Sequence, residues 1–312
     1  MDPARFLAAS RLLIVAGKGG VGKTTVSAAL AAAAARQGRS VLLVEIEGKS
    51  GLAGLFGREP LGYDEVELAD GVRGRTITPD EALLEYLREH GLSRISKRLV
   101  SSGALEIVAT AAPGIRDILV LGKVRSLEQT EAADLLVLDA PAAGHAITFL
   151  LSARGLLDAV KVGPINTQAR EALEMLTDPK RAQVILVTLP EETPVNELID
   201  TAYHLEDRVG VSLGPVVVNG LVPEVAGLDI DPEQAAADAG TTLLAGEAEA
   251  LRAAAAFRAE RGALQAEQLA RLSESLPLPQ LHLPALPVTA LGGAELERLA
   301  DELLRGIEGL PG

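Results

Sequence analysis

Glycine, lysine and threonine residues near the N-terminus stand in a spacing that suits phosphate binding. Residues 17–24 read Gly-Lys-Gly-Gly-Val-Gly-Lys-Thr, which fits the phosphate-loop pattern G-x-x-x-x-G-K-[ST]. The glycines let the backbone curl so that N–H groups point at phosphate oxygens, and the helix expected after them adds the positive end of its dipole. Lys23 can reach the β- and γ-phosphates, and the Thr24 hydroxyl can ligate Mg²⁺. The loop therefore predicts a site for a nucleoside triphosphate.

The elements around the loop have the expected character. Residues 12–15 read as a short buried strand, and residues 25–37 form an alanine-rich stretch without proline or glycine, which is typical of a helix. Further apolar runs alternate with helical stretches. The candidate strands are residues 11–16, 40–46, 134–139, 182–188, 214–219 and 279–284. This pattern predicts an α/β fold with a doubly wound, mostly parallel sheet.

We expect a single phosphate-loop domain over residues 1–312, with helices inserted into it. Helix-like pieces at 80–90, 92–108 and 114–129 fall in the long gap between the second and third strands, and 145–178 looks like a helical pair. We interpret 58–133 and 145–178 together as a helical subdomain. Two further helices are expected within 232–274, with breaks near the glycines at 240 and 246, and a terminal helix over 294–307 should pack on the sheet.

Carboxylates follow two of the predicted strands. Asp139 ends the run 135–138 at the carboxyl end of its strand, where ligands collect in open α/β sheets, so we expect it to hold the Mg²⁺ site opposite Thr24. Glu45 and Glu47 end the second strand, and either could orient an attacking water over the γ-phosphate. We favour Glu47 as the catalytic carboxylate because glycines follow it.

Two other residues are candidates for contacts with the nucleotide. Lys18, the second lysine of the loop, can project away from its own nucleotide and reach one bound by a facing subunit, where a cation would aid phosphoryl transfer. Asn219 closes the apolar run 216–218, and its amide could contact adenine or simply form a turn.

The composition excludes several functions. A formal net charge of −14 argues against a nucleic-acid partner or direct insertion into an anionic membrane. The absence of cysteine rules out disulfides and thiolate metal sites, zinc included. No secretion signal is evident, so we expect a cytoplasmic protein.

These motifs resemble the ArsA/Get group of dimeric ATPases, whose phosphate loop also carries a second lysine. Residues 41–57 align without gaps on the first-switch pattern VLLxSTDPAHxLxDxFG, residues 139–145 match DTAPTGH in length, and residues 216–221 resemble the strand-Asn motif that contacts adenine. The resemblance covers nearly the whole chain and is strongest to a glutamate-containing actinobacterial branch. The phosphate-binding residues carried over by position are Gly17, Lys18, Gly19, Gly20, Val21, Gly22, Lys23, Thr24 and Thr25.

The resemblance implies a homodimer, or a heterodimer with a paralogue, that clamps ATP and Mg²⁺ at its interface. Lys18 would act across the dimer, Glu47 would replace the water-activating aspartate, and Asn219 would contact adenine. In the Get branch the helical subdomains shield hydrophobic membrane anchors, so we expect a hydrophobic protein client. The helical face of Ile115, Ile118 and Leu119 could line its groove or be ordinary core.

Departures from the family pattern keep alternatives open. Glu47 is one methylene longer than the family's aspartate, which fits a weakly hydrolysing regulatory subunit of a paralogous ATPase. A pump-associated anion-transport ATPase is a second alternative, although the missing cysteines exclude capture of arsenite by thiolates. A positioning protein of the MinD or ParA type would need a basic or lipid-inserting surface.

Overall fold

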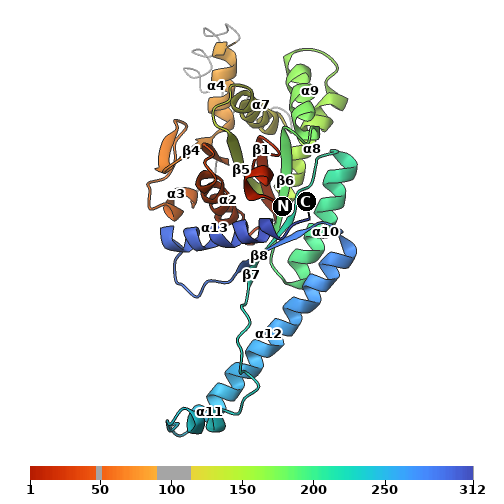
Figure 1. Cartoon of the computed structure of the whole chain (residues 1–312). Helices are drawn as coiled ribbons and strands as arrows, with labels where there is room; N and C mark the ends of the chain where they lie inside the picture. The colour runs from red at the N-terminus through yellow and green to blue at the C-terminus, as the bar shows by residue number, and fades with distance from the viewer. Residues whose placement is uncertain (47–50, 90–113, 312) are drawn as a thin grey trace.

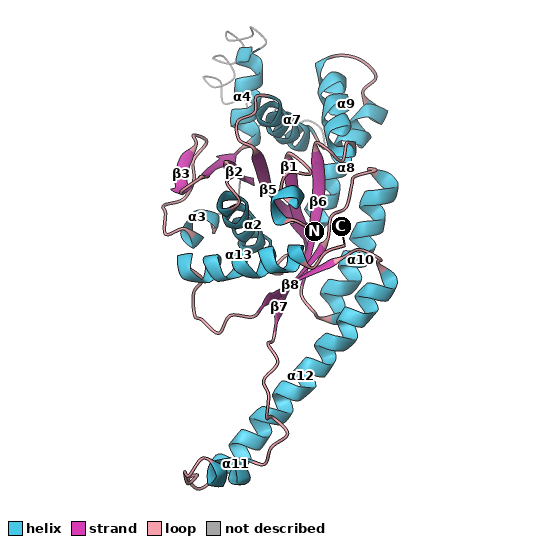
Figure 2. Cartoon of the chain, in the orientation of Figure 1, coloured by secondary structure: helices cyan, strands magenta, loops and turns pink. Residues whose placement is uncertain are grey.

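The computed structural model of the chain describes residues 1–46, 51–89 and 114–311. Its strands form one eight-stranded sheet in the order β3-β4-β2-β5-β1-β6-β7-β8, in which only β3 and β4 pair antiparallel (Figures 1 and 2). The strands are β1 (Leu12–Gly17), β2 (Val41–Ile46), β3 (Val66–Ala69), β4 (Val72–Ile77), β5 (Leu135–Ala142), β6 (Ala182–Thr188), β7 (Val216–Leu221) and β8 (Gln280–Pro284). The predicted α/β fold with a mostly parallel sheet is confirmed.

Helices cover both faces of this sheet. Those in the described part of the chain are α1 (Pro3–Phe6), α2 (Lys23–Arg36), α3 (Leu52–Leu55), α4 (Pro79–Glu89), α7 (Ile115–Gln129), α8 (Ala143–Ala159), α9 (Pro164–Thr177), α10 (Glu192–Arg208), α11 (Pro232–Asp238), α12 (Glu247–Ser275) and α13 (Gly293–Glu308). Alternate strand residues point to opposite faces, so Leu13 and Val15 of β1 join the core with α2 and α13, whereas Leu12 and Ile14 join the core with α7 to α10.

Helix α2 packs against the sheet and against α13, which itself also packs on β8. Every residue from 28 to 34 is at most 6% exposed, and all but one of them are alanine. Side chains this small let the helix approach the sheet closely while α13 covers its other side with Leu296, Leu299 and Leu303. The predicted packing of the terminal helix on the sheet is confirmed.

The sequence did not reveal the hairpin β3-β4, which extends the sheet inside the region predicted to be helical. β4 interleaves Arg73, Arg75 and Thr76 with apolar residues, so it lacks the continuous apolar run of a central strand. The helices of the 58–133 region therefore begin only at Pro79. The predicted piece 92–108 lies outside the described residues. The helical pair within 145–178 is present as α8 and α9.

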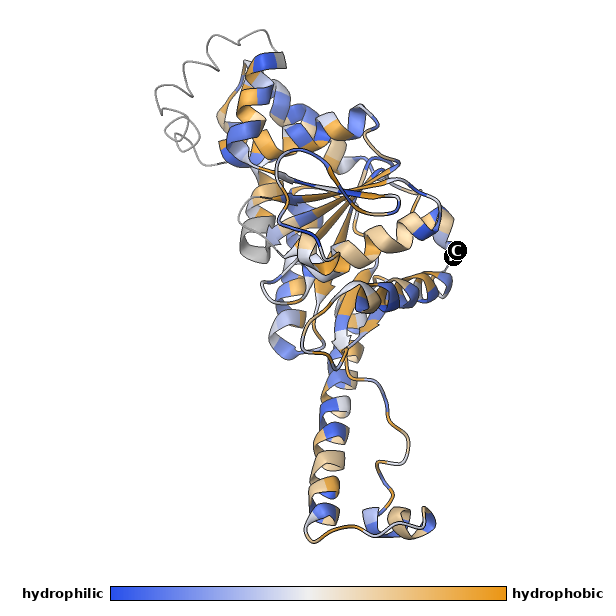
Figure 3. Cartoon of the chain, turned by 90° about the vertical axis from the view of Figure 1, so that its left-hand side faces the viewer, coloured by the Kyte–Doolittle hydropathy of each residue, from blue (hydrophilic) through white to orange (hydrophobic). Residues whose placement is uncertain are grey.

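Residues 222–275 form an arm that leaves the end of β7, passes through α11 and returns along α12 to β8. Figure 1 shows α12 projecting from the body with α11 at its far end, and Figure 3 shows apolar residues along it. Its two helices, separated across Gly240 and Gly246, were predicted. Within the described residues, more than half of the exposed large apolar side chains belong to the arm: Val225, Ile230, Leu244, Leu251, Phe257 and Leu264.

Neither this arm nor any other helix of the described ranges is long and apolar enough to cross a membrane. Its root is tied to the body by hydrogen bonds. Gln265 Nε2 donates to the carbonyl of Gly220 in β7 at 3.5 Å, and the Tyr203 hydroxyl of α10 donates to the carbonyl of Ser275 at 2.8 Å. The arm is thereby joined to both β7 and α10.

A charged cluster joins the helical region to the edge of the sheet. Glu85 of α4 accepts a hydrogen bond from Lys123 of α7 at 2.6 Å and another from the Tyr63 hydroxyl, while the guanidinium of Arg75 lies 4.4 Å from the centre of the Tyr63 ring. Burial alone would raise the pKa of Glu85, but the hydrogen bonds from Lys123 and Tyr63 lower it below its ordinary value. The ionised carboxylate therefore stabilises the fold.

We predict that Glu85→Gln lowers the free energy of unfolding at pH 7 by about 1–3 kcal/mol, because the Lys123 ammonium is left without its carboxylate. Since the folded pKa of Glu85 is depressed, its contribution is complete above pH 4.5, the ordinary value, and is lost as pH falls through the folded pKa. Urea unfolding at several pH values measures both effects. Glu67→Gln, at an exposed position of β3, is the control. An equal loss in both variants, or a loss that persists below the folded pKa, would contradict the assignment.

Candidate functional site

The phosphate loop joins β1, at the centre of the sheet, to the first turn of α2. β1 lies between β5 and β6, so the loop emerges at the carboxyl edge of the three central strands. Two glycines are required by the local geometry. A Cβ on Gly17 (φ +156°) would lie 2.3 Å from the Val187 carbonyl oxygen, and one on Gly22 (φ +89°) would lie 2.3 Å from Asn219 Nδ2. Larger residues would push the loop away from its neighbours.

Lys23 and Thr24 open α2 at this edge. The Lys23 side chain is buried and its Nζ donates to the carbonyl of Lys18 at 2.8 Å, so the amine lies across the loop. Thr24 Oγ1 donates to Oδ2 of Asp139 at 2.7 Å. Asp139, in β5, is fully buried. The contact brings together the two residues that the sequence assigned to the metal site.

The donor set of this pair fits Mg²⁺, which prefers hydroxyl and carboxylate oxygens. No group of three or more His, Cys, Asp or Glu side chains that could hold a metal ion occurs among the described residues. A Mg²⁺ ion at Thr24 and Asp139 would therefore depend on nucleotide and water oxygens for its remaining ligands, as is usual for this ion. The metal role of these two residues stays a prediction that the geometry allows.

Glu45 is the second buried carboxylate at this edge. It lies opposite Asp139 in the register of the parallel pair β2 and β5, and only 1% of its surface is exposed. Residues opposite one another in such a pair point to the same face, so both carboxylates face α2. The preferred catalytic candidate, Glu47, lies outside the described residues. Of the two glutamates that the sequence offered as catalytic candidates, Glu45 is the one that the structure describes, and it lies beside Asp139.

Asn219 lies in β7, beside the loop. Its Nδ2 donates to the Val21 carbonyl at 2.9 Å and lies against Gly22. The amide thus supports the backbone that carries Lys23. Contact with adenine remains a prediction for this residue.

Lys18 has a partner that the sequence did not suggest. Its Nζ forms an ion pair with Oε1 of Glu197, a residue of α10 that is 179 positions away in the chain. The side chains are 36% and 42% exposed, so the pair lies at the surface beside the loop. Glu197 is one of several acidic residues on an amphipathic helix, and nothing in its local sequence distinguishes it.

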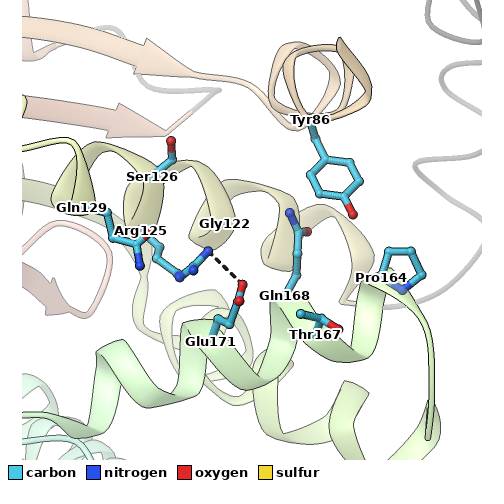
Figure 4. A pocket seen from close by; sticks show the side chains of 9 residues that line it. All are labelled: Tyr86, Gly122, Arg125, Ser126, Gln129, Pro164, Thr167, Gln168 and Glu171. Carbon is cyan, nitrogen blue, oxygen red and sulfur yellow. Dashed lines mark ion pairs between the residues drawn. The ribbon is translucent and has the colours of Figure 1, made fainter. Parts of the chain in front are cut away.

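A cavity of about 480 Å³ lies apart from the loop, between α4, α7 and α9. Figure 4 shows Arg125 and Glu171 facing one another across it, with their ion pair at 2.9 Å, and Tyr86 and Gln168 nearby. Most of the residues that line it have polar side chains, although their apolar atoms form about half of the lining surface. The face of Ile115, Ile118 and Leu119 does not line it, because Ile118 and Leu119 are buried in the core. Of the two interpretations of that face, ordinary core is correct.

Comparison with known proteins gives one consistent family. A sequence model described as anion-transporting ATPase matches residues 10–163. The chain is 33% identical to ATPase BagA of Mycobacterium tuberculosis over 308 residues, which covers 91% of this chain and 89% of BagA. The similarity to an arsenical pump-driving ATPase of Escherichia coli is 28% over 242 residues, covering 68% of this chain and 40% of that longer protein. An arsenical pump-driving ATPase of Acidiphilium multivorum is 27% identical over 241 residues.

The contact between Gly22 and Asn219 can be tested without nucleotide. We predict that Gly22→Ala lowers the free energy of unfolding by at least about 2 kcal/mol, because backbone strain at positive φ adds to the clash with Asn219. Gly20→Ala is the matched control: its φ is +88°, but no atom lies within 4 Å of the added Cβ, so only about 1 kcal/mol of strain is expected. Urea unfolding of the two variants gives the difference, and equal losses would show that the contact does not constrain the loop.

Proposed function

The chain belongs to the anion-transporting ATPase family, and we propose that it is a magnesium-dependent ATPase that works as a dimer and uses its ATP cycle to change how it binds a protein partner. The single observation that supports this proposal best is the Thr24–Asp139 hydrogen bond. It sets a hydroxyl and a carboxylate side by side at the start of α2, directly after a loop shaped for phosphates.

In this proposal, different groups of the chain bind the phosphates, hold Mg²⁺ and orient the attacking water. The loop N–H groups and the start of α2 would bind the β- and γ-phosphates, and Lys23 would exchange its contact with the Lys18 carbonyl for phosphate oxygens. Thr24 and Asp139 would hold Mg²⁺, which neutralises phosphate charge when bound. Glu47, or Glu45 on the same strand end, would orient the attacking water.

A dimer is proposed because of the direction that Lys18 takes. Lys23 lies across the loop, whereas the Lys18 side chain extends to α10 and is partly exposed. An ammonium at the surface beside the loop is suited to meet a nucleotide held by a facing protomer. The partner protomer would be a second copy or a paralogue.

The identity of the protein partner follows from the resemblance rather than from the described surface. The face of Ile118 and Leu119 is buried, and most of the residues that line the cavity between α4, α7 and α9 have polar side chains. A hydrophobic membrane-protein client therefore stays a prediction. The absence of cysteine from the whole sequence argues against an arsenite-capturing pump subunit.

We predict that Lys18→Ala lowers ATP turnover by at least about a hundredfold while ATP affinity stays near the wild-type value, since cations supplied in trans contribute roughly 10³–10⁵ in rate for arginine fingers. Lys161→Ala, at an exposed position after α8, is the control. Steady-state ATPase assays and nucleotide titration give the two quantities.

Light scattering after size exclusion, with a non-hydrolysable ATP analogue and Mg²⁺, tests the dimer in the same samples. Normal turnover in Lys18→Ala would reject the role in trans. Tight ATP binding without turnover in the wild-type protein would favour the regulatory-subunit alternative.

A further inference from the structure

The ion pair between Lys18 and Glu197 joins the phosphate loop to a helix that has no part in the proposed chemistry. Lys18 lies two residues before Gly20 in the loop, and Glu197 lies in the second turn of α10. The two atoms, Lys18 Nζ and Glu197 Oε1, belong to the same protomer. The proposed function requires the Lys18 ammonium to reach the nucleotide of a facing protomer. In this structure the ammonium is paired with a carboxylate of its own protomer.

The carboxylate of Glu197 is carried by a helix that contacts α12 and the residue at its end on both sides of Glu197 in the sequence. Near its start, the carbonyl of Glu192 accepts from Arg271 Nη2 at 3.1 Å, and Glu191 forms an ion pair with Arg261 at 3.5 Å; both arginines belong to α12. Farther along, Tyr203 donates to the carbonyl of Ser275. These contacts set the place of Glu197 beside the phosphate loop.

The strength of the Lys18–Glu197 ion pair depends on how far its two side chains are exposed to solvent. Both side chains are more than one third exposed, so solvent screens the attraction and the pair is weak. A nucleotide polyphosphate carries several negative charges and accepts hydrogen bonds more strongly than one carboxylate. The ammonium has three N–H donors, so competition would come from position: reaching toward a facing protomer would take it away from Glu197. A second protomer presenting a bound nucleotide would therefore draw the ammonium away from Glu197.

We propose that Glu197 is a positioning residue that retains Lys18 within its own protomer until a nucleotide-loaded partner arrives. This inference rests on the proposed role of Lys18 in trans. Glu197 opposes association by competing with the partner's nucleotide for the Lys18 ammonium. It touches neither reacting atom nor nucleotide.

The test compares Glu197→Gln with the wild-type protein. Removal of the charge should lower the protein concentration needed for half-maximal dimerisation with ATP analogue and Mg²⁺ by about two- to thirtyfold, the range expected when two half-exposed ion pairs, one in each protomer, no longer have to break. ATP affinity of the protomer should be unchanged, because Lys18 does not serve its own nucleotide. Glu197→Asp, which keeps the charge, should stay close to wild type. Glu206→Gln, an exposed residue of the same helix, controls for net charge.

The Lys18→Ala background separates this inference from the proposed function. There Glu197→Gln should change the midpoint of dimerisation no more than Glu206→Gln does, because the ammonium that it releases is absent. If Lys18→Ala alone leaves turnover unchanged, the role in trans and this inference both fail. If Lys18→Ala lowers turnover but Glu197→Gln matches wild type, or acts equally in both backgrounds, only the inference on Glu197 is overturned.

Discussion

The placement of the start of α2 against the carboxyl end of β5 is the constraint on which the site depends. Alanine side chains let α2 sit close to the sheet, α13 closes over its outer side, and the loop before it can take only the path that Gly17 and Gly22 allow. With the helix fixed in this way, Thr24 reaches Asp139 without further support. The geometry of the Thr24–Asp139 pair is therefore a consequence of core packing.

Much of this arrangement could be predicted because it is local in sequence or follows from general rules for parallel sheets. The loop pattern identifies its own strand and helix, and Asp139 follows a run of apolar residues whose burial is unambiguous. Carboxyl ends of parallel strands meet at one edge, which is why Thr24 and Asp139 could be paired from positions 115 residues apart. The same rule placed Glu45 near the site.

Other features could not be predicted because their signal is either weak or not local. The hairpin β3-β4 mixes arginine and threonine with apolar residues, as edge strands do, and so it resembled a loop. The partnership of Lys18 with Glu197 depends on how α10 is docked, and a surface glutamate on an amphipathic helix has no distinguishing pattern. Composition showed the helices of the arm but not that they project from the body with Phe257 and Leu264 exposed.

The central claim is that each nucleotide is completed by a lysine from the other protomer, and a mixing experiment tests it most directly. Asp139→Asn should disable the site of its own protomer but keep Lys18, whereas Lys18→Ala keeps its own site but gives nothing to its partner. Each variant alone should be inactive. An equal mixture should recover about one quarter of wild-type turnover, since half of the randomly paired symmetric dimers would then be mixed, each with one complete site. A mixture as inactive as its components would contradict the account.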